Sequence, residues 1–153
     1  ENHDRQRALD VVRASSSLPY VSKIVEVDGI PMLDGGIADS IPVQHAIDMG
    51  WQHNVVVLTR NKGWRDMGKD HKIPYLYKNY PRLRVALSHR HRAYNEQIQL
   101  VDDLEAAGKI TCIRPIRPLE VGRIEKDTDK LERLYEEGFM LGEAFCEKCV
   151  EKE

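Results

Sequence analysis

The sequence predicts an α/β fold, in which a parallel or mixed sheet is flanked by helices. The main reason is segment 54–59, Asn-Val-Val-Val-Leu-Thr, an apolar run without alternation. Such a run predicts a strand covered on both faces. It follows a helix-like segment that ends at Gly50, and helix, glycine and buried strand in this order are typical of α/β domains. The stretch from Asp127 onwards has the apolar period of a closing helix.

Length and composition narrow the class of protein. The chain has 153 residues and a net charge of −2, enough for one domain and unlike a dedicated nucleic-acid binder. No apolar run approaches the ~20 residues of a transmembrane helix, and the polar start Glu1-Asn2-His3-Asp4-Arg5 is no signal peptide. Three cysteines, an odd number, form no disulfide framework and favour a reducing cytoplasm.

The first element is a helix expected over 4–14, with an apolar face made of Ala8, Leu9, Val11 and Val12. Ser15-Ser16-Ser17 follows, before Pro19. Serines ahead of such a bend usually cap or turn the backbone. None lies in a Gly-x-Ser-x-Gly frame, so we interpret them as structural.

A hairpin is expected next, because segments 23–27 and 30–33 flank Asp28-Gly29, a common two-residue turn. The second strand ends in Asp34-Gly35-Gly36. Glycines can adopt positive φ and carry no Cβ, so they leave open space beside Asp34. Taken alone, this tripeptide favours a plain turn.

Segment 43–50 is expected to be a helix capped by Asp39 or Ser40. Residues 60–71 read as a loop in which Trp64 packs onto the domain. A helix from Pro81 and a second helix from Tyr94 are expected on either side of the junction 88–92.

The last expected elements are a strand over 109–114 and a helix from Asp127 or Thr128. The buried stripe expected for this helix consists of Leu131, Leu134, Tyr135, Gly138, Leu141 and Phe145.

Two motifs could bind metal, and both have a simpler explanation. His89 and His91 have no third ligand at a recognisable spacing, so a solvated basic junction is favoured. There, Arg90 and Arg92 could instead attract anionic lipid headgroups. Cys146-Glu147-Lys148-Cys149 has no second pair and is read as incidental. We expect no metal and no cofactor.

Several strings in order resemble the patatin-like acyl hydrolases. They are Ala14-Ser15-Ser16-Ser17-Leu18-Pro19, Val25-Glu26-Val27-Asp28-Gly29, Leu33-Asp34-Gly35-Gly36 and Ile41-Pro42-Val43, and the likeness continues through Arg114-Pro115-Ile116-Arg117-Pro118-Leu119. The resemblance implies a partial patatin-like three-layer sandwich ending in a helical extension. Residues 1–60 would be the C-terminal part of the catalytic domain, and 61–153 the family's C-terminal extension.

The resemblance also implies a reaction. Asp34 would be the aspartate of a Ser-Asp dyad that cleaves lipid acyl esters, with Gly35 and Gly36 forming the turn beside it. Because no Gly-x-Ser-x-Gly occurs, the serine and the oxyanion loop would come from a missing N-terminal half of the same protein. The isolated chain would then be inactive, and an uncovered sheet edge could form a homodimer. The alternative is a non-catalytic domain that folds independently or binds a partner. Peripheral contact with a membrane stays open.

Overall fold

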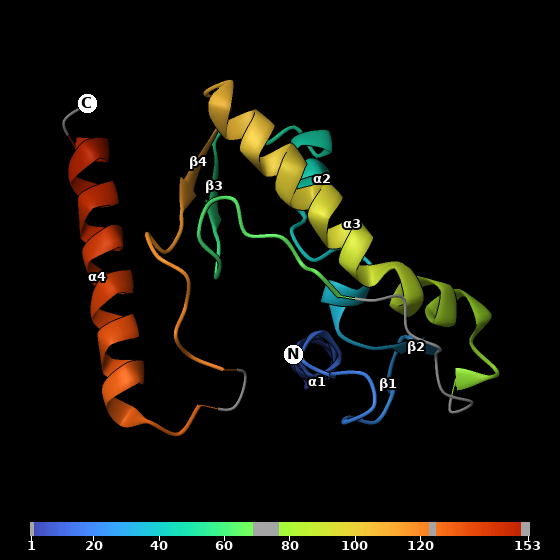
Figure 1. The fold of residues 1–153 in the computed structure, drawn as a ribbon. Helices are drawn as coiled ribbons and strands as arrows, with labels where there is room; N and C mark the ends of the chain where they lie inside the picture. The colour runs from blue at the N-terminus through green and yellow to red at the C-terminus, as the bar shows by residue number, and fades with distance from the viewer. Residues whose placement is uncertain (1, 69–76, 123–124, 151–153) are drawn as a thin grey trace. The chain divides into compact units, whose positions relative to one another are not determined.

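A computed structural model describes residues 2–68, 77–122 and 125–150 (Figure 1). The elements in chain order are α1 (Asn2–Ser15), β1 (Val25–Val27), β2 (Ile30–Met32), the 3₁₀ turn η1 (Gly35–Ile37), α2 (Val43–Asp48), β3 (Asn54–Val57), α3 (Pro81–Ala106), β4 (Ile110–Ile113) and α4 (Thr128–Val150). The predicted α/β class and the closing helix are confirmed.

The chain forms two compact units that do not follow the sequence in two halves. Unit 1 contains Glu1–Pro42 and Asp66–Ile98, and unit 2 contains Val43–Arg65 and Gln99–Glu153. Each unit is described below by itself. The division at residue 60 stays a prediction.

In unit 1, β1 and β2 form the predicted antiparallel hairpin, with Val27 opposite Ile30. Asp28 and Gly29 at its tip have φ of +51° and +77°, as a type I′ turn requires. Ala14 at the end of α1 packs with Val25 and Val27, and these three buried side chains form a core cluster. The hairpin is therefore fixed to the last turn of α1.

The apolar face predicted for α1 is not buried by the described residues. Leu9 and Val12 are 56% and 66% exposed, whereas Ala14 is 3% exposed. The hairpin covers only the C-terminal end of the helix. The rest of α1 presents its apolar side chains to solvent.

In unit 2, β3 and β4 pair in parallel, with Asn54 opposite Ile110, which agrees with the prediction of a parallel or mixed sheet. The expectation that β3 is covered on both faces is wrong, because Val55 and Val57 are 50% and 72% exposed. Along this short strand the side chains alternate between half-buried and exposed. Among the described residues, the sheet has two strands and one open face.

Two helices, α2 and α3, end close to a glycine that has a positive φ. Gly50 and Gly108 have φ of +92° and +66°. At the first of these ends, Gly50 N donates to Ile47 O at 2.9 Å and Trp51 N donates to Ala46 O at 3.1 Å. This is the Schellman pattern, which satisfies the last carbonyls of the helix.

The predicted break between two helices at 88–92 is absent, because α3 is continuous from Pro81 to Ala106. The segment Ser88-His89-Arg90-His91-Arg92 contains neither glycine nor proline, so no backbone hydrogen bond has to be lost there. The Ser88 hydroxyl donates to Val85 O at 2.8 Å, within the helix. Polarity alone did not end the helix.

A cluster of ion pairs joins β4 to the last turns of α3 in unit 2. Arg114, whose side chain is 9% exposed, lies 2.8 Å from Asp102 and 2.7 Å from Glu105. Arg65 lies 3.1 Å from Asp102. Burial raises the pKa of Asp102, but the hydrogen bonds from Arg114 and Arg65 outweigh this and lower the pKa below its ordinary value.

Burial is also the main cause of the raised pKa of the Cys112 thiol.

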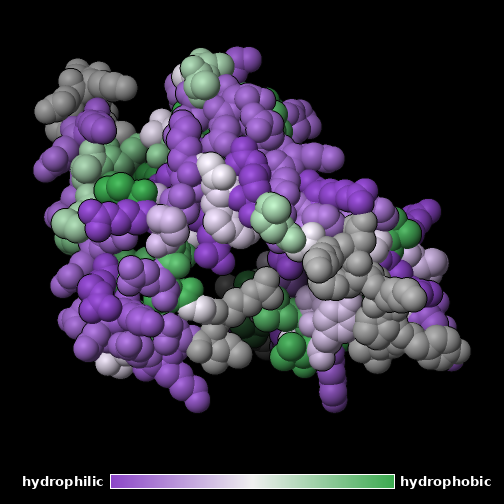
Figure 2. All heavy atoms as spheres, in the orientation of Figure 1, coloured by the Kyte–Doolittle hydropathy of each residue, from purple (hydrophilic) through white to green (hydrophobic). Residues whose placement is uncertain are grey.

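Asp127 caps α4, as one of the two predicted residues. Its Oδ1 accepts from Asp129 N at 3.1 Å and from Lys130 N at 3.3 Å. The predicted buried stripe is wrong in part, because Leu131 and Tyr135 are 42% and 71% exposed. Only the part of α4 beside β4 is covered, and Figure 2 shows hydrophobic residues among the charged ones over this helix.

Candidate functional site

Asp34 lies where the hairpin ends and a tight turn begins, as the sequence predicted. Its backbone N–H donates to Ser17 O at 2.9 Å, and its own carbonyl accepts from Ile37 N at 3.2 Å. Ser17 is 5% exposed, and its hydroxyl donates to Arg13 O at 2.7 Å. The end of α1 therefore fixes the start of the turn, and the hydroxyl of Ser17 serves the helix end.

The carboxylate of Asp34 is half-buried, and one of its oxygens is held by the turn itself. Gly36 N donates to Oδ1 at 2.8 Å. No hydrogen bond from a described residue reaches the other oxygen. Among the described residues, one acceptor atom of Asp34 is therefore available to another group.

The two glycines act through the absence of a side chain. The glycines with positive φ in the described chain are Gly29, Gly50, Gly63 and Gly108, so Gly35 and Gly36 do not use the positive φ that glycine allows. A Cβ at Gly36 would lie 3.0 Å from Asp34 Oδ1, whereas a Cβ at Gly35 would meet nothing within 4 Å. Gly36 gives room to the carboxylate, and Gly35 borders open space.

The carbonyl of Gly36 is bound from two sides. The Ser40 hydroxyl donates to it at 2.7 Å, and Arg90 Nε of α3 donates to it at 3.2 Å. Arg90 was interpreted as part of a basic junction, and its contact with Gly36 was not predicted.

Gln97 of α3 holds the segment that follows the turn. Its Oε1 accepts from Ser40 N at 3.1 Å and from Ile41 N at 3.2 Å, and its Nε2 donates to Asp39 Oδ1 at 2.7 Å. Sequence reasoning missed this residue. Its position about two helical turns after Arg90, and so on the same face of α3, was the signal available.

These contacts correct the predicted cap of α2. The helix begins at Val43, and neither candidate side chain caps it. Asp39 accepts from Gln97, and Ser40 donates to Gly36 O. Their side chains are used to hold the turn after Asp34.

Chemically, this arrangement presents a carboxylate that can accept a proton from a hydroxyl group. A general base must lie within about 2.6–3.2 Å of the atom it deprotonates. The open space beside Gly35 allows such an approach. The hydroxyl groups of Ser17 and Ser40 donate hydrogen bonds to backbone carbonyls.

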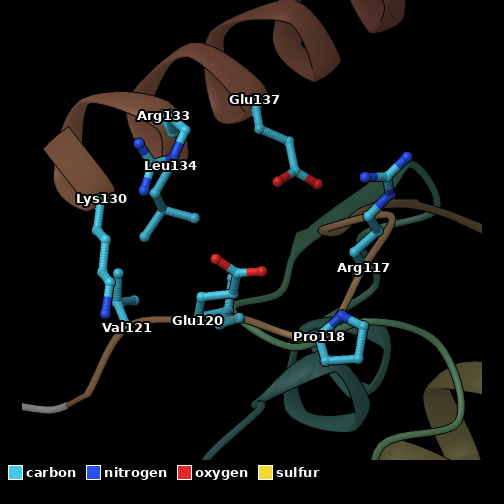
Figure 3. A pocket seen from close by; sticks show the side chains of 9 residues that line it. Arg117, Pro118, Glu120, Val121, Lys130, Arg133, Leu134 and Glu137 are labelled. Carbon is cyan, nitrogen blue, oxygen red and sulfur yellow. The ribbon is translucent and has the colours of Figure 1, made fainter.

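Two cavities in unit 2 are other candidate sites. One, of about 240 Å³, lies between the start of α4 and segment 117–121, and Glu137 and Glu120 point toward each other across it (Figure 3). The second, of about 270 Å³, is mainly apolar and lies where β3 and β4 end. Neither is lined by Asp34 or by a serine.

The described residues contain no group of three or more His, Cys, Asp and Glu side chains placed to hold a metal ion. In the same part of the chain, no helix has the length and apolarity needed to cross a membrane. Cys146 is exposed, and the side chain of Cys149 lies outside the described residues.

Two known families match separate parts of the chain. Residues 2–47 match the family described as patatin-like phospholipase. Residues 80–151 match a family described as a domain of unknown function (DUF6363). The chain is also 28% identical over 151 residues to the uncharacterized protein YjjU of Escherichia coli strain K12, an alignment that covers 92% of this chain. The chain spans 41% of the length of that relative.

Proposed function

We propose that this chain is the C-terminal portion of a patatin-like serine hydrolase that cleaves lipid acyl esters, and that Asp34 is the base of its Ser-Asp dyad. The observation that carries the proposal is the carboxylate of Asp34, with one oxygen bound to Gly36 N at 2.8 Å and the other open. The match of residues 2–47 to patatin-like phospholipases supports the class of reaction.

In the proposed mechanism, the nucleophile is a serine from the part of the protein that precedes this chain. Its hydroxyl proton passes to the open oxygen of Asp34 as the serine oxygen attacks the ester carbonyl. The proton then goes to the departing alcohol, and an acyl-serine is left. Water, deprotonated by Asp34, attacks the acyl-serine. The bond between the acyl carbon and the serine oxygen then breaks, Asp34 returns the proton to that oxygen, and the fatty acid is released. Backbone donors outside this chain would stabilise the oxyanion.

The proposed partner is the N-terminal half of the same protein. Two surfaces support the proposal, namely the apolar side chains of α1 around Leu9 and Val12, and those of β3 at Val55 and Val57, because all four are at least half exposed. Exposed apolar side chains that lie together mark interaction surfaces. In the isolated chain, the open edges of the β3–β4 sheet would instead favour a homodimer.

The proposed function is tested on the longer protein, which would contain both the N-terminal half and this chain. The measurement is hydrolysis of a short-chain nitrophenyl ester. Asp34→Asn is expected to lower kcat at least about a hundredfold, the scale on which general-base catalysis contributes. Asp28→Asn is the matched control, because Asp28 also precedes a glycine and Asn-Gly suits the same type I′ turn. Equal activity of both variants would reject Asp34 as the base. If the longer protein hydrolyses no ester at all, the alternative of a non-catalytic domain is favoured.

A further inference from the structure

One side chain of α3 holds the whole segment from Asp39 to Ile41. The amide of Gln97 uses both of its ends, with Oε1 accepting from two backbone N–H groups and Nε2 donating to Asp39 Oδ1 at 2.7 Å. A carboxylate could not donate, and an ammonium group could not accept. As long as residue 39 is an aspartate, the site therefore needs an amide at position 97.

Gly36 connects this contact to Asp34. Ser40, whose N–H is bound by Gln97, donates its hydroxyl to Gly36 O at 2.7 Å. Gly36 N in turn donates to Asp34 Oδ1 at 2.8 Å. An unbroken path of hydrogen bonds thus runs from α3 to the carboxylate.

Arg90 supplies a second contact from the same helix. Its Nε donates to Gly36 O at 3.2 Å, about two turns before Gln97 on the same face of α3. A hydrogen bond from a guanidinium is charge-assisted and stronger than one between neutral groups. Gly36 is thus held from α3 both directly and through Ser40.

We propose that α3 is a positioning element for the reaction, in which Gln97 and Arg90 orient the carboxylate of Asp34 through Gly36. This inference rests on the proposed function of Asp34. It assigns a role to a helix in the region that matches a domain of unknown function. Gln97 and Arg90 are positioning residues, because they contact the turn and not the reacting atoms.

Amide hydrogen exchange in this chain tests the structural half of the inference. Gln97→Ala is expected to speed exchange at Ser40, Ile41 and Gly36 about tenfold, the effect of losing a hydrogen bond of about 1.4 kcal/mol. Gln99→Ala is the matched control, because that glutamine of α3 binds Arg65 and Asp103 instead. Unchanged exchange at Gly36 in Gln97→Ala would overturn the inference.

Kinetic measurements on the longer protein test whether Gln97 and Arg90 contribute to catalysis. Gln97→Ala and Arg90→Ala are each expected to lower kcat about ten- to hundredfold, the cost of misplacing a reacting group. KM should stay unchanged if both residues act only by positioning Asp34, and a raised KM in Arg90→Ala would instead indicate that Arg90 binds the lipid headgroup. Arg84→Ala is the control for Arg90, since Arg84 is an exposed arginine of the same helix and, in the described part of the chain, no hydrogen bond joins its side chain to the turn.

A polarity swap separates positioning from folding. In Gln97→Glu, two carboxylates would face each other where Nε2 now donates to Asp39, and kcat should fall. Adding Asp39→Asn restores a donor and an acceptor with reversed roles, and kcat should recover at least about tenfold. Failure of this rescue, with both variants folded by circular dichroism, would overturn the inference. If the longer protein hydrolyses no ester, the proposed function fails, and the exchange rates still decide whether α3 positions Asp34.

Discussion

Gly36 donates its backbone N–H to Asp34 Oδ1 at 2.8 Å, and a Cβ on Gly36 would lie 3.0 Å from that same oxygen. Gly36 is therefore the hydrogen-bond partner of the Asp34 carboxylate. Because Gly36 has no Cβ, it also leaves the space that this carboxylate occupies. Neighbouring Gly35 borders open space. The two glycines consequently have different roles, although they are adjacent.

Alanine at each glycine should separate these roles in the isolated chain. Gly36→Ala is expected to shift the Asp34 carboxylate by a few tenths of an ångström and to weaken the Gly36 N–H bond, because the added Cβ would lie closer to Asp34 Oδ1 than most real contacts do. Gly35→Ala should leave both unchanged. Amide chemical shifts of residues 34–37 report the difference, and equal shifts in the two variants would contradict it.

In the longer protein, Gly35→Ala should reduce ester hydrolysis although the fold of this chain is unchanged. The reason is that the proposed serine must approach Asp34 to within about 3 Å, through the space that the Cβ would occupy. Full activity of Gly35→Ala would place the approach of the serine elsewhere.

The continuity of α3 predicts a cost for glycine at its centre. His89→Gly should be less stable than His89→Ala by about 1 kcal/mol, the difference in helix propensity between the two residues. Urea denaturation of both variants measures this difference. Equal stability would support the two-helix interpretation with a junction at 88–92.

Acid sensitivity should depend on Asp102. The pKa of Asp102 is lower in the folded chain than its ordinary value, so its ion pairs stabilise the fold at pH above about 4, and this contribution is lost as pH falls through the folded pKa. Asp102→Asn should cost about 1–3 kcal/mol at pH 7, between the effects of breaking a surface ion pair and a buried one, because Asp102 is part-buried. It should also flatten the loss of stability in acid.

Asp103→Asn is the control for this measurement. Asp103 is exposed and accepts from Gln99 Nε2 at 2.9 Å, so its removal should change the free energy of unfolding by no more than about 0.5 kcal/mol. If both variants lose the same stability, the cluster around Arg114 is not what fixes β4 to α3.

The open face of β3 should make the isolated chain self-associate. Val57 is 72% exposed, and a lysine there would place a charge on the apolar surface. Sedimentation velocity should show a dimer for the unchanged chain and a monomer for Val57→Lys. Val85→Lys is the control, because Val85 is an exposed valine on α3. A monomeric unchanged chain would contradict the prediction.

The sequence predicted the elements whose causes are local. Asp28-Gly29 specified the hairpin, Gly50 ended α2, and the run from Asn54 specified a strand that pairs in parallel. Each depends on the conformational preference of one or two residues or on a short apolar pattern. Such signals can be read without knowing the tertiary contacts.

The failures concern burial and long-range contact. The apolar stripe of α4 was expected to be buried, but Tyr135 is exposed, as is Leu9 on the apolar face of α1. Periodicity shows that a face is apolar and not what covers it. Gln97 was missed because a single polar residue in a helix carries no pattern. Its role appears only when the turn after Asp34 lies beside α3.

Labelling with a fluorophosphonate is the most direct test of the central claim, that Asp34 activates a serine outside this chain. The probe reacts with activated serines, and mass spectrometry locates the labelled residue in the longer protein. We expect a labelled serine before the segment that corresponds to residue 1, and labelling at least about a hundredfold slower in Asp34→Asn but not in Asp28→Asn. Label on a serine of residues 1–153, or equal rates in Asp34→Asn and the unchanged protein, would contradict the account.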